Sequence, residues 1–466
     1  MRQPEDAFRA YRDKAAEYRG ATYASKRRRR DPVDPAIDPW RLPLERINVA
    51  NPALFKADLV EPYFARLRAE APVHYCAESQ YGPYWSITRF RDILAIDSDP
   101  ARFSSDARSG GVAITGTAQS GEFIPMFIQS DPPRHDRQRA AVAPRFAPSR
   151  LAELEATIRG WAGAILDQLP RGETFDWVQR VAKPLTGQML ATLLGLPVNE
   201  WQRLVAWSDI LANPDNPEIV PSPAVFYDTL ADMGEFFAAR WNDALAASGG
   251  SGAAVDPGPG GPHQPPPDPV APDLIAMLAH GAGTRDMGPR ELVGNMLLLI
   301  QGGNDTTRNS ITGGLLALHR FPDQFALLRA NPGLIPNMVS EIIRWQTPLA
   351  HMARTATCDV TLHGQTIRAG DRVILWYLSG NRDETVIPDA HAFLIDRPNA
   401  RHHLSFGFGV HRCLGNRLAE MQLRVLWEEI LARRLDLRVE GPPERISSCF
   451  FRGFSQLPVS IGHAPV

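Results

Sequence analysis

Cysteine is scarce in this chain. Its 466 residues include four cysteines, Cys76, Cys358, Cys413 and Cys449. Their wide spacing fits neither a disulfide framework nor the paired CxxC ligands of a zinc site. Thiols so scattered are also a poor set of ligands for an iron–sulfur cluster. We therefore expect a protein of a reducing compartment, the cytoplasm.

Long apolar runs and a surplus of one charge are lacking too. No run approaches the roughly 20 residues that cross a bilayer, and the first residues, MRQPEDAFRAYRDK, lack the apolar segment of a signal peptide. Fifty Lys plus Arg balance 52 Asp plus Glu, a formal net charge of −2, which argues against a nucleic-acid or membrane-surface binder. With 44% hydrophobic residues, the composition is that of an ordinary globular protein.

Internal repeats are absent, and two segments have compositions that disfavour packing. No repeat with a period of about 20 to 50 residues occurs, which excludes solenoids and propellers. Residues 1–44 are polar and Pro-rich, and the basic run at residues 26–30 predicts a solvated arm, with docking to an acidic partner as the alternative. Residues 248–272, GGSGAAVDPGPGGPHQPPPDPVAPD, predict a flexible surface loop because Gly and Pro disfavour helix and strand.

Residues 45–466 read as one large unit that is mainly helical with small β-sheets, an α+β class, and short extended pieces at residues 83–88 and 372–377. The longest helical signal begins at Pro289 and continues to His319. At 1.5 Å per residue, this helix is about 45 Å long. Its first half is apolar on most sides, which predicts burial.

The middle of that helix departs from the apolar pattern at residues 301–307, QGGNDTT. Two glycines inside a helix each cost roughly 1 kcal/mol relative to Ala, and an acid with two hydroxyls follows them. Glycine lets a flat ligand approach the backbone, while Asp and Thr can bond into the helix or hold water beside that ligand. A tolerated polar kink between packed helices is the alternative.

A second unusual motif, FGFGVHRCLG, occupies residues 406–415 and precedes an amphipathic helix from about Asn416 to Arg434. Three glycines around Cys413 indicate a rigid loop that aims a sulfur atom. The helix dipole and first-turn N–H groups are expected to lower the pKa of this thiol. A lone cysteine is more often a small buried hydrophobe, so the whole motif has to be explained.

This loop matches FxxGxxxCxG, and the chain resembles the cytochrome P450 family of haem-thiolate monooxygenases. Three further features occur in the expected order. Glu341 and Arg344 match the family's ExxR pair, and Arg397 matches the arginine that completes its structural triad. The segment Gly302-Gly303-x-Asp305-Thr306 matches the oxygen-activation helix. Without the resemblance, Glu341 and Arg344 would be an ordinary surface pair worth a few tenths of a kcal/mol.

The resemblance implies the P450 fold, with the long helix over haem b (iron protoporphyrin IX), and Cys413 as the iron ligand. Asp305 would relay protons, and the Thr306 hydroxyl would act where dioxygen is activated. The implied haem-binding residues, including those that meet its carboxylates, are His135, Arg139, Gly302, Arg354, Phe406 and His411. The triad would fix the side of the haem that carries the thiolate.

Electrons have to come from outside, because nothing in the chain resembles a flavin or iron–sulfur domain. The resemblance therefore implies a ferredoxin and a ferredoxin reductase as partners. Four arginines near the expected docking face could meet an acidic ferredoxin: Arg134, Arg137, Arg412 and Arg417. Scattered solvated arginines are the alternative.

Longer strings, among them GGNDTTRNS and RHHLSFGFGVHRCLGNRLAEMQLR, resemble the bacterial subfamily that hydroxylates the terminal carbon of medium-chain alkanes and fatty acids, over residues 45–461. An apolar substrate and O2 would then react in a pocket beside the haem. The candidate lining residues are Phe123, Ile124, Met126, Phe127, Leu349, Met352 and Phe451. The alternative is that these residues belong to the ordinary hydrophobic core.

Gln301 departs from the subfamily, which tends to carry an aliphatic residue there. Its amide could favour a substrate with an oxygen function, or it could bond a helix carbonyl. Other functions stay open: a haem-based sensor, a steroid or terpenoid hydroxylase, and a peroxide-driven peroxygenase. The Asp-Thr pair argues against a sensor and a peroxygenase.

Overall fold

The structure is a computed structural model that describes residues 8–20, 33–114, 124–213, 216, 219–247 and 273–462. The basic run at residues 26–30, the pocket candidate Phe123 and the predicted loop at residues 248–272 lie outside the described residues. Within them, the expectation of a mainly helical fold with small sheets is confirmed. The helices are α2 (Arg9–Glu17), α3 (Pro52–Lys56), α4 (Glu61–Glu70), α5 (Phe90–Asp97), α6 (Arg134–Val142), α7 (Pro148–Ala152), α8 (Glu155–Asp167), α9 (Lys183–Leu193), α10 (Trp201–Leu211), α11 (Pro223–Ala247), α12 (Leu274–His280), α13 (Pro289–Arg320), α14 (Pro322–Ala330), α15 (Ile335–Gln346), α16 (Tyr377–Gly380) and α17 (Asn416–Ala432).

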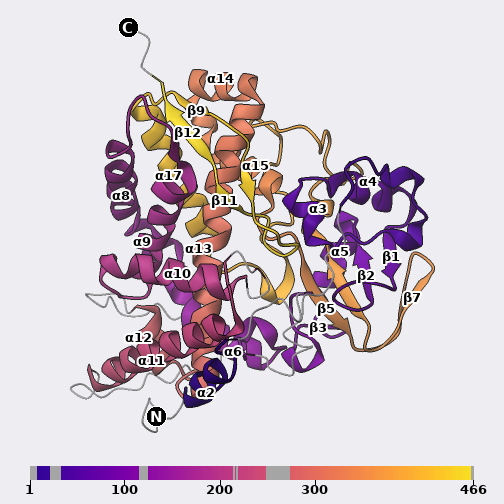
Figure 1. Cartoon of the computed structure of the whole chain (residues 1–466), viewed down its shortest axis with the longest axis horizontal. Helices are drawn as coiled ribbons and strands as arrows, with labels where there is room; N and C mark the ends of the chain where they lie inside the picture. The colour runs from indigo at the N-terminus through magenta and orange to yellow at the C-terminus, as the bar shows by residue number, and fades with distance from the viewer. Residues whose placement is uncertain are drawn as a thin grey trace.

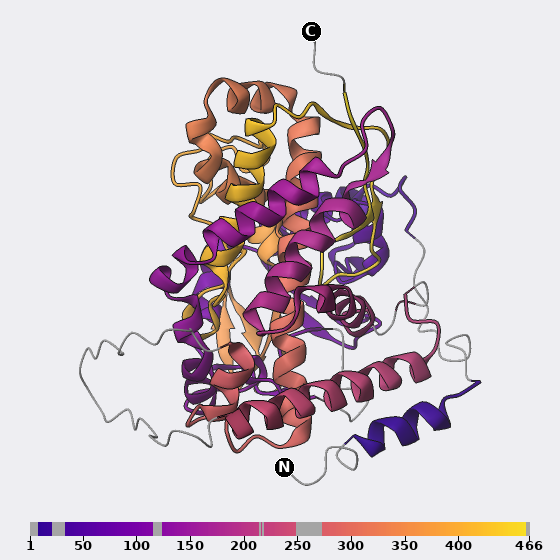
Figure 2. The same cartoon turned by 90° about the vertical axis from the view of Figure 1, so that its left-hand side faces the viewer.

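Helix α13 is the axis of the molecule and runs through its centre in both views (Figures 1 and 2). It has 32 residues, begins at Pro289 and ends one residue beyond the predicted His319. Pro289 suits the first helical position because its missing N–H has no partner to lose there. Helices α9, α10, α11, α15 and α17 pack around this axis and bury most of its side chains.

The largest sheet has five strands in the order β1-β2-β8-β5-β3 and lies on the opposite side of α13 from α8 and α17 (Figure 1). Strands β2 and β8 pair in parallel, while β5 pairs antiparallel with β8 and places Arg354 opposite Val373. The strands are β1 (Val73–Cys76), β2 (Tyr84–Ile87), β3 (Phe103–Ser104), β4 (Phe175–Asp176), β5 (Met352–Ala356), β6 (Val360–Leu362), β7 (Gln365–Ile367), β8 (Arg372–Leu375), β9 (Leu437–Val439), β10 (Glu444–Arg445), β11 (Phe454–Gln456) and β12 (Pro458–Ile461).

The polar segment of the first 44 residues includes a packed helix, although the basic run at residues 26–30, predicted to be a solvated arm, lies outside the described residues. Helix α2 lies alongside α11 (Figure 2), and it buries Phe8, Tyr11 and Ala15 in the main core. These three residues follow the spacing of one helical face, a signal that the polar composition of the segment hides.

No helix of the described residues combines the length and the apolar character that crossing a bilayer requires.

Candidate active site

The loop that carries Cys413 is held in shape by two glycines. Gly407 and Gly409 have φ angles of +64° and +65°, a region that side chains rarely adopt. A Cβ added at Gly409 would lie 2.5 Å from the carbonyl oxygen of Asp97, so close packing also requires glycine. The backbone N–H of Cys413 donates to the carbonyl of Phe406 at 2.8 Å, just before α17 begins.

Asp97, at the end of α5, connects this loop to β5. One carboxylate oxygen accepts a hydrogen bond from Arg354 Nη2 at 2.6 Å. The other accepts from the Tyr377 hydroxyl at 2.7 Å and from the N–H of Phe408 at 2.8 Å. Asp97, Arg354 and Tyr377 are all buried, so these charge-assisted bonds act in a low dielectric. The same carboxylate therefore fixes the loop and orients a buried cation.

The Cys413 side chain is accessible, although protein surrounds it closely. The expectation of a lowered thiol pKa is wrong for the protein alone: burial raises the pKa of Cys413 above its ordinary value. The N–H of Gly415 and the charges of Arg139 and Arg412 act in the opposite direction but do not outweigh burial. The sequence shows the dipole of α17 but not the density of the surrounding protein.

Several nitrogen groups gather beside this loop. The rings of His135, on α6, and His411 lie 4.2 Å apart between centroids. Nε2 of His135 and both ring nitrogens of His411 are buried and have no hydrogen-bond partner in the described part of the chain. Arg139 donates to the carbonyl of Arg412, and Arg354 acts electrostatically on His411. Buried polar atoms normally have partners, so these nitrogens point to a missing ligand with acceptor groups.

The middle of α13 is accessible although the rest of the helix is largely buried. Gly302 is exposed, and Gln301, Gly303 and Thr306 are half-buried, whereas every residue from 307 to 318 is buried. A Cβ added at Gly302 would meet no atom within 4 Å. The Thr306 hydroxyl donates to the carbonyl of Gly302 at 3.1 Å. The helix thus presents an open patch of bare backbone with a hydroxyl beside it.

Asp305 belongs to a network that extends away from this patch. Ser208, on α10, donates to its carboxylate at 2.8 Å, and Arg308 binds its other oxygen. Arg308 also pairs with Asp209 at 2.6 Å, and Asp209 pairs with Lys183 at 2.8 Å. Burial raises the pKa of the Asp305 carboxyl, and Asp209 adds to the rise, although Arg308 and Ser208 act against it. A buried acid that gains a proton more easily than usual is suited to proton exchange.

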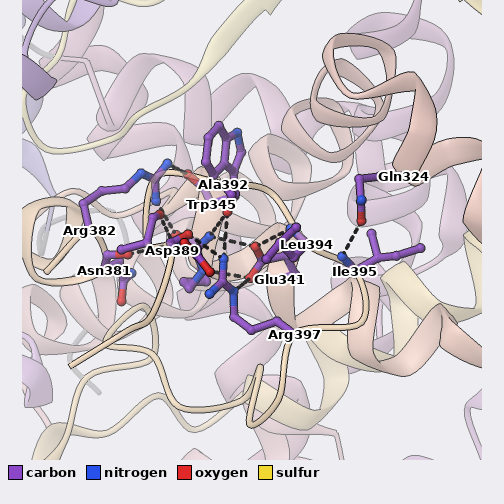
Figure 3. A network of polar contacts seen from close by, with 12 residues as sticks. Gln324, Glu341, Trp345, Asn381, Arg382, Asp389, Ala392, Leu394, Ile395 and Arg397 are labelled. Carbon is purple, nitrogen blue, oxygen red and sulfur yellow. Dashed lines mark hydrogen bonds and ion pairs between the residues drawn. The ribbon is translucent and has the colours of Figure 1, made fainter. Parts of the chain in front are cut away.

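Glu341, Arg344 and Arg397 form one buried network. Figure 3 shows Glu341 and Arg397 side by side within it. Both carboxylate oxygens of Glu341 accept from Arg344 at 2.7 Å, and one also accepts from Arg397 Nε at 3.1 Å. The N–H of Leu394 donates to the same carboxylate at 2.9 Å. Arg344 donates further to the carbonyls of Asn381, Ala390 and Ala392. The network ties α15 to the segment that leads to the cysteine loop.

Comparisons with known proteins agree with this geometry. The family model "Cytochrome P450" matches residues 271–461. Linalool 8-monooxygenase of Pseudomonas putida is 36% identical, with 89% of this chain and 99% of that protein covered. The chain belongs to the cytochrome P450 family.

Two further P450s are similar over most of their length. Methyl-branched lipid omega-hydroxylase of Mycobacterium bovis is 31% identical, and the match covers 86% of this chain and 91% of that protein. The solved structure of cytochrome P450-153 from Novosphingobium aromaticivorans superposes with a TM-score of 0.80 at 41% identity, covering 91% of this chain and 99% of that structure. The family resemblance read from the sequence is therefore confirmed.

Haem is the cofactor of P450s, and the residues present fit it. A haem of this family requires a thiolate for its iron, open space against its flat face, and polar partners for its two carboxylates. The accessible Cys413, the bare backbone at Gly302, and the unpartnered nitrogens of His135 and His411 match these three requirements in turn.

The candidate pocket residues fall into two groups. Leu349 and Phe451 pair through an isolated β-bridge, and Met352 begins β5 beside them. Ile124 and Phe127 are buried members of the main core, with Met126 packed against it. The backbone N–H of Phe127 donates a hydrogen bond to Asn295 Oδ1, on α13, at 2.8 Å.

The four arginines expected at the docking face are not equivalent. Arg134 pairs with Glu291 of α13, so its charge is already paired within the protein. Arg137, Arg412 and Arg417 are exposed. Arg417 also lines a surface pocket of about 260 Å³ between α15 and α17.

Three residues that join distant segments through hydrogen bonds were not predicted from the sequence. Asp97 and Ser208 occur in no motif, and only the fold brings them to Arg354 and Asp305. His351 is the third: its Nδ1 donates to the carbonyl of Cys449 at 2.9 Å, and Nε2 accepts from the N–H of Ile114 at 3.2 Å. Its position three residues before Arg354 was the available signal.

Proposed function

We propose that this P450 inserts one oxygen atom of O2 into the terminal C–H bond of a medium-chain n-alkane or fatty acid, with electrons from a ferredoxin and its reductase. The observation that carries the proposal is the accessible patch at Gly302 and Thr306 in the middle of a buried helix. The omega-hydroxylase relative supports terminal attack.

Cys413 is the proposed axial ligand of the haem, and His135, Arg139, Arg354 and His411 are the proposed partners of its carboxylates. A thiolate-ligated haem supplies the dioxygen chemistry, including an oxidant able to attack an unactivated C–H bond. The contribution of this chain is to hold the group and to keep its carboxylates paired inside the protein.

Proton delivery is assigned to Asp305 and Thr306. Asp305 is the buried acid with the raised pKa, and Asp209 and Lys183 connect its network to partly exposed side chains. Thr306 directs its hydroxyl at the Gly302 carbonyl on the open patch, where it can turn to donate to an oxygen ligand. This division matches an acid that supplies protons and an alcohol that positions them.

Terminal attack demands positioning. A primary C–H bond is stronger than a secondary one by roughly 3 kcal/mol, which would slow terminal attack by on the order of a hundredfold if the whole gap appeared in the barrier. A narrow channel has to present the chain end alone. Leu349 and Phe451, joined by their β-bridge, are the proposed walls that restrict the chain.

The test is gas chromatography of products from the reconstituted holoenzyme with octane and decanoic acid. We expect the terminal alcohol as the main product, and Phe451→Ala should move attack inward because the wall is removed. Leu349→Met, which keeps the side-chain volume, serves as control. A wild-type mixture dominated by 2- and 3-alcohols contradicts the proposal.

Hydroxylation of a terpenoid is the second candidate, favoured by the linalool 8-monooxygenase relative. Competition between linalool and octane for the same holoenzyme separates the two candidates. Preferential turnover of linalool selects the second.

Ferredoxin docking is assigned to the exposed Arg137, Arg412 and Arg417. Arg137→Glu and Arg417→Glu should raise the KM for ferredoxin severalfold, with a smaller effect at high salt, because steering by opposite charges is screened. Arg46→Glu, an exposed arginine elsewhere, is the matched control. Equal KM values in all three variants contradict this docking face.

A further inference from the structure

Gln301 is a polar residue in the apolar half of α13. The five residues before it are Met296, Leu297, Leu298, Leu299 and Ile300. Gln301 itself is half-buried and directly precedes the exposed Gly302. It therefore borders the open patch in sequence, on the helix α13 that other elements surround (Figures 1 and 2).

The Gln301 amide has no hydrogen-bond partner among the described residues. Its polar atoms are not fully buried, so a ligand or water can reach them. Other polar side chains of this helix bond the carbonyl four residues earlier: Thr306 bonds Gly302, Ser310 bonds Thr306, and Thr312 bonds Arg308. Gln301 forms no such bond. Of the two interpretations that the sequence left open, the bond to a helix carbonyl is therefore not the one realised.

Asp305, four residues further along the helix, does not hydrogen-bond the Gln301 amide either. Its two oxygens are taken by Ser208 and Arg308. Within the described residues, the Gln301 amide thus keeps its NH2 donors and its carbonyl acceptor free of protein partners, one residue before the exposed Gly302.

We propose that Gln301 hydrogen-bonds a neutral oxygen atom of the substrate, so that the enzyme prefers an apolar substrate that carries an alcohol or carbonyl group to the corresponding hydrocarbon. This proposal rests on the proposed function only in placing the substrate beside Gly302. A hydrocarbon that displaces water from the amide leaves it unpaired, at a cost of about 1–3 kcal/mol. A hydroxyl satisfies both amide groups, since it accepts from the NH2 and donates to the carbonyl.

The chemistry of the amide narrows the class further. An amide carries no charge, so it does not compensate the burial of a carboxylate. Because Gln301 adjoins Gly302, the oxygen function has to lie near the reacting end, within the reach of one side chain, and not at the far end of a long chain. Sites built around one polar group discriminate strongly against analogues that lack its partner.

The test uses the haem-loaded wild type and two variants, with binding as the readout. Linalool and its hydrocarbon counterpart 3,7-dimethylocta-1,6-diene form a matched ligand pair, and 1-octanol with octane forms a second. Gln301→Met keeps the side-chain length and removes the amide, while Leu298→Met changes a half-buried neighbour without touching the amide. Dissociation constants come from calorimetry and equilibrium dialysis.

We expect the wild type and Leu298→Met to bind each alcohol more tightly than its hydrocarbon, and Gln301→Met to reduce that preference about tenfold, mainly by binding the hydrocarbon better. A preference unchanged in Gln301→Met, or no binding of either alcohol by the wild type, overturns the inference. Product analysis tests terminal hydroxylation separately, so internal alcohols would contradict the proposed function while leaving this binding result intact.

Discussion

Asp97 and Arg354 lie 257 residues apart in sequence, and their side chains are joined by a 2.6 Å hydrogen bond in the interior. The same carboxylate also accepts from the N–H of Phe408 in the cysteine loop. A change at Asp97 is therefore transmitted both to the loop that positions Cys413 and to a cation proposed to meet a haem carboxylate.

Asp97→Ala should lower haem content and destabilise the haem-free protein by about 3–5 kcal/mol, because without the haem carboxylates it leaves Arg354 as a buried charge without a counterion. Tyr377→Phe removes one of the three hydrogen bonds and keeps the charge pair, so it should cost only about 1 kcal/mol. Haem per protein and the thermal midpoint measure both effects. Equal losses in the two variants would show that the Asp97–Arg354 pair has no special role.

Helix α2 should act as a strap on α11. Arg12 pairs with Asp228, Asp232 and Glu235, and the first cause of its raised pKa is the hydrogen bond to Glu235. Arg12→Glu adds a fourth carboxylate to this cluster, so it should lower the thermal midpoint by a few degrees, less at high salt.

Asp13→Lys is the matched control for this strap, because Asp13 is exposed on the same helix. Phe8→Ala should cost more than Arg12→Glu, about 3–5 kcal/mol, since Phe8 is fully buried against Gly234. Midpoints that match wild type in both Phe8→Ala and Arg12→Glu would show that α2 does not stabilise the protein.

The sequence predicted the residues that motifs carry, and it failed where the fold brings single residues together. Glu341 and Arg344 are three apart on one helix and the Cys413 loop is contiguous, so the family's short motifs could locate them, although spacing alone would have made Glu341 and Arg344 a surface pair. Asp97 is 311 residues from Phe408, and one acid at the end of a short helix has no distinguishing pattern. Burial also decided what spacing could not: it raises the Cys413 pKa against the helix dipole.

Cys413→His should abolish the thiolate-type carbon monoxide difference spectrum, because imidazole is a weaker electron donor to iron than a thiolate. Cys358→Ser is the matched control, since Cys358 is the other exposed cysteine. An unchanged spectrum in Cys413→His would remove the assignment of the ligand.

Thr306→Ala should leave substrate binding nearly unchanged but divert electrons to peroxide, since its hydroxyl is needed only after oxygen binds. Asp305→Asn should slow turnover by 10- to 100-fold as an order-of-magnitude expectation, because the buried acid is lost while Ser208 and Arg308 keep a partner. The measurement is product formed per reduced nicotinamide consumed. Fully coupled turnover in Thr306→Ala would refute its role.

His351 should make the stability of the protein sensitive to acid. Burial lowers its pKa to about 3, and Arg372 acts in the same direction while the Cys449 carbonyl opposes it. In the unfolded chain the His351 imidazole binds a proton when the pH falls below its ordinary pKa of about 6.5. In the folded protein the same imidazole stays neutral until about pH 3. The stability that depends on neutral His351 is present above pH 6.5 and is lost as the pH falls toward 3, about 2 kcal/mol of it by pH 5.

His351→Phe isolates this contribution. The ring keeps its packing against Trp376 and Phe450, but the N–H of Ile114 and the carbonyl of Cys449 lose their partner, at a cost of about 2–4 kcal/mol at pH 7. Because the variant has no imidazole to protonate on unfolding, the difference from wild type should shrink by about 2 kcal/mol at pH 5. Denaturant unfolding of the holoenzyme at both pH values measures it, and a difference that stays constant or grows would show that His351 is protonated in the folded protein.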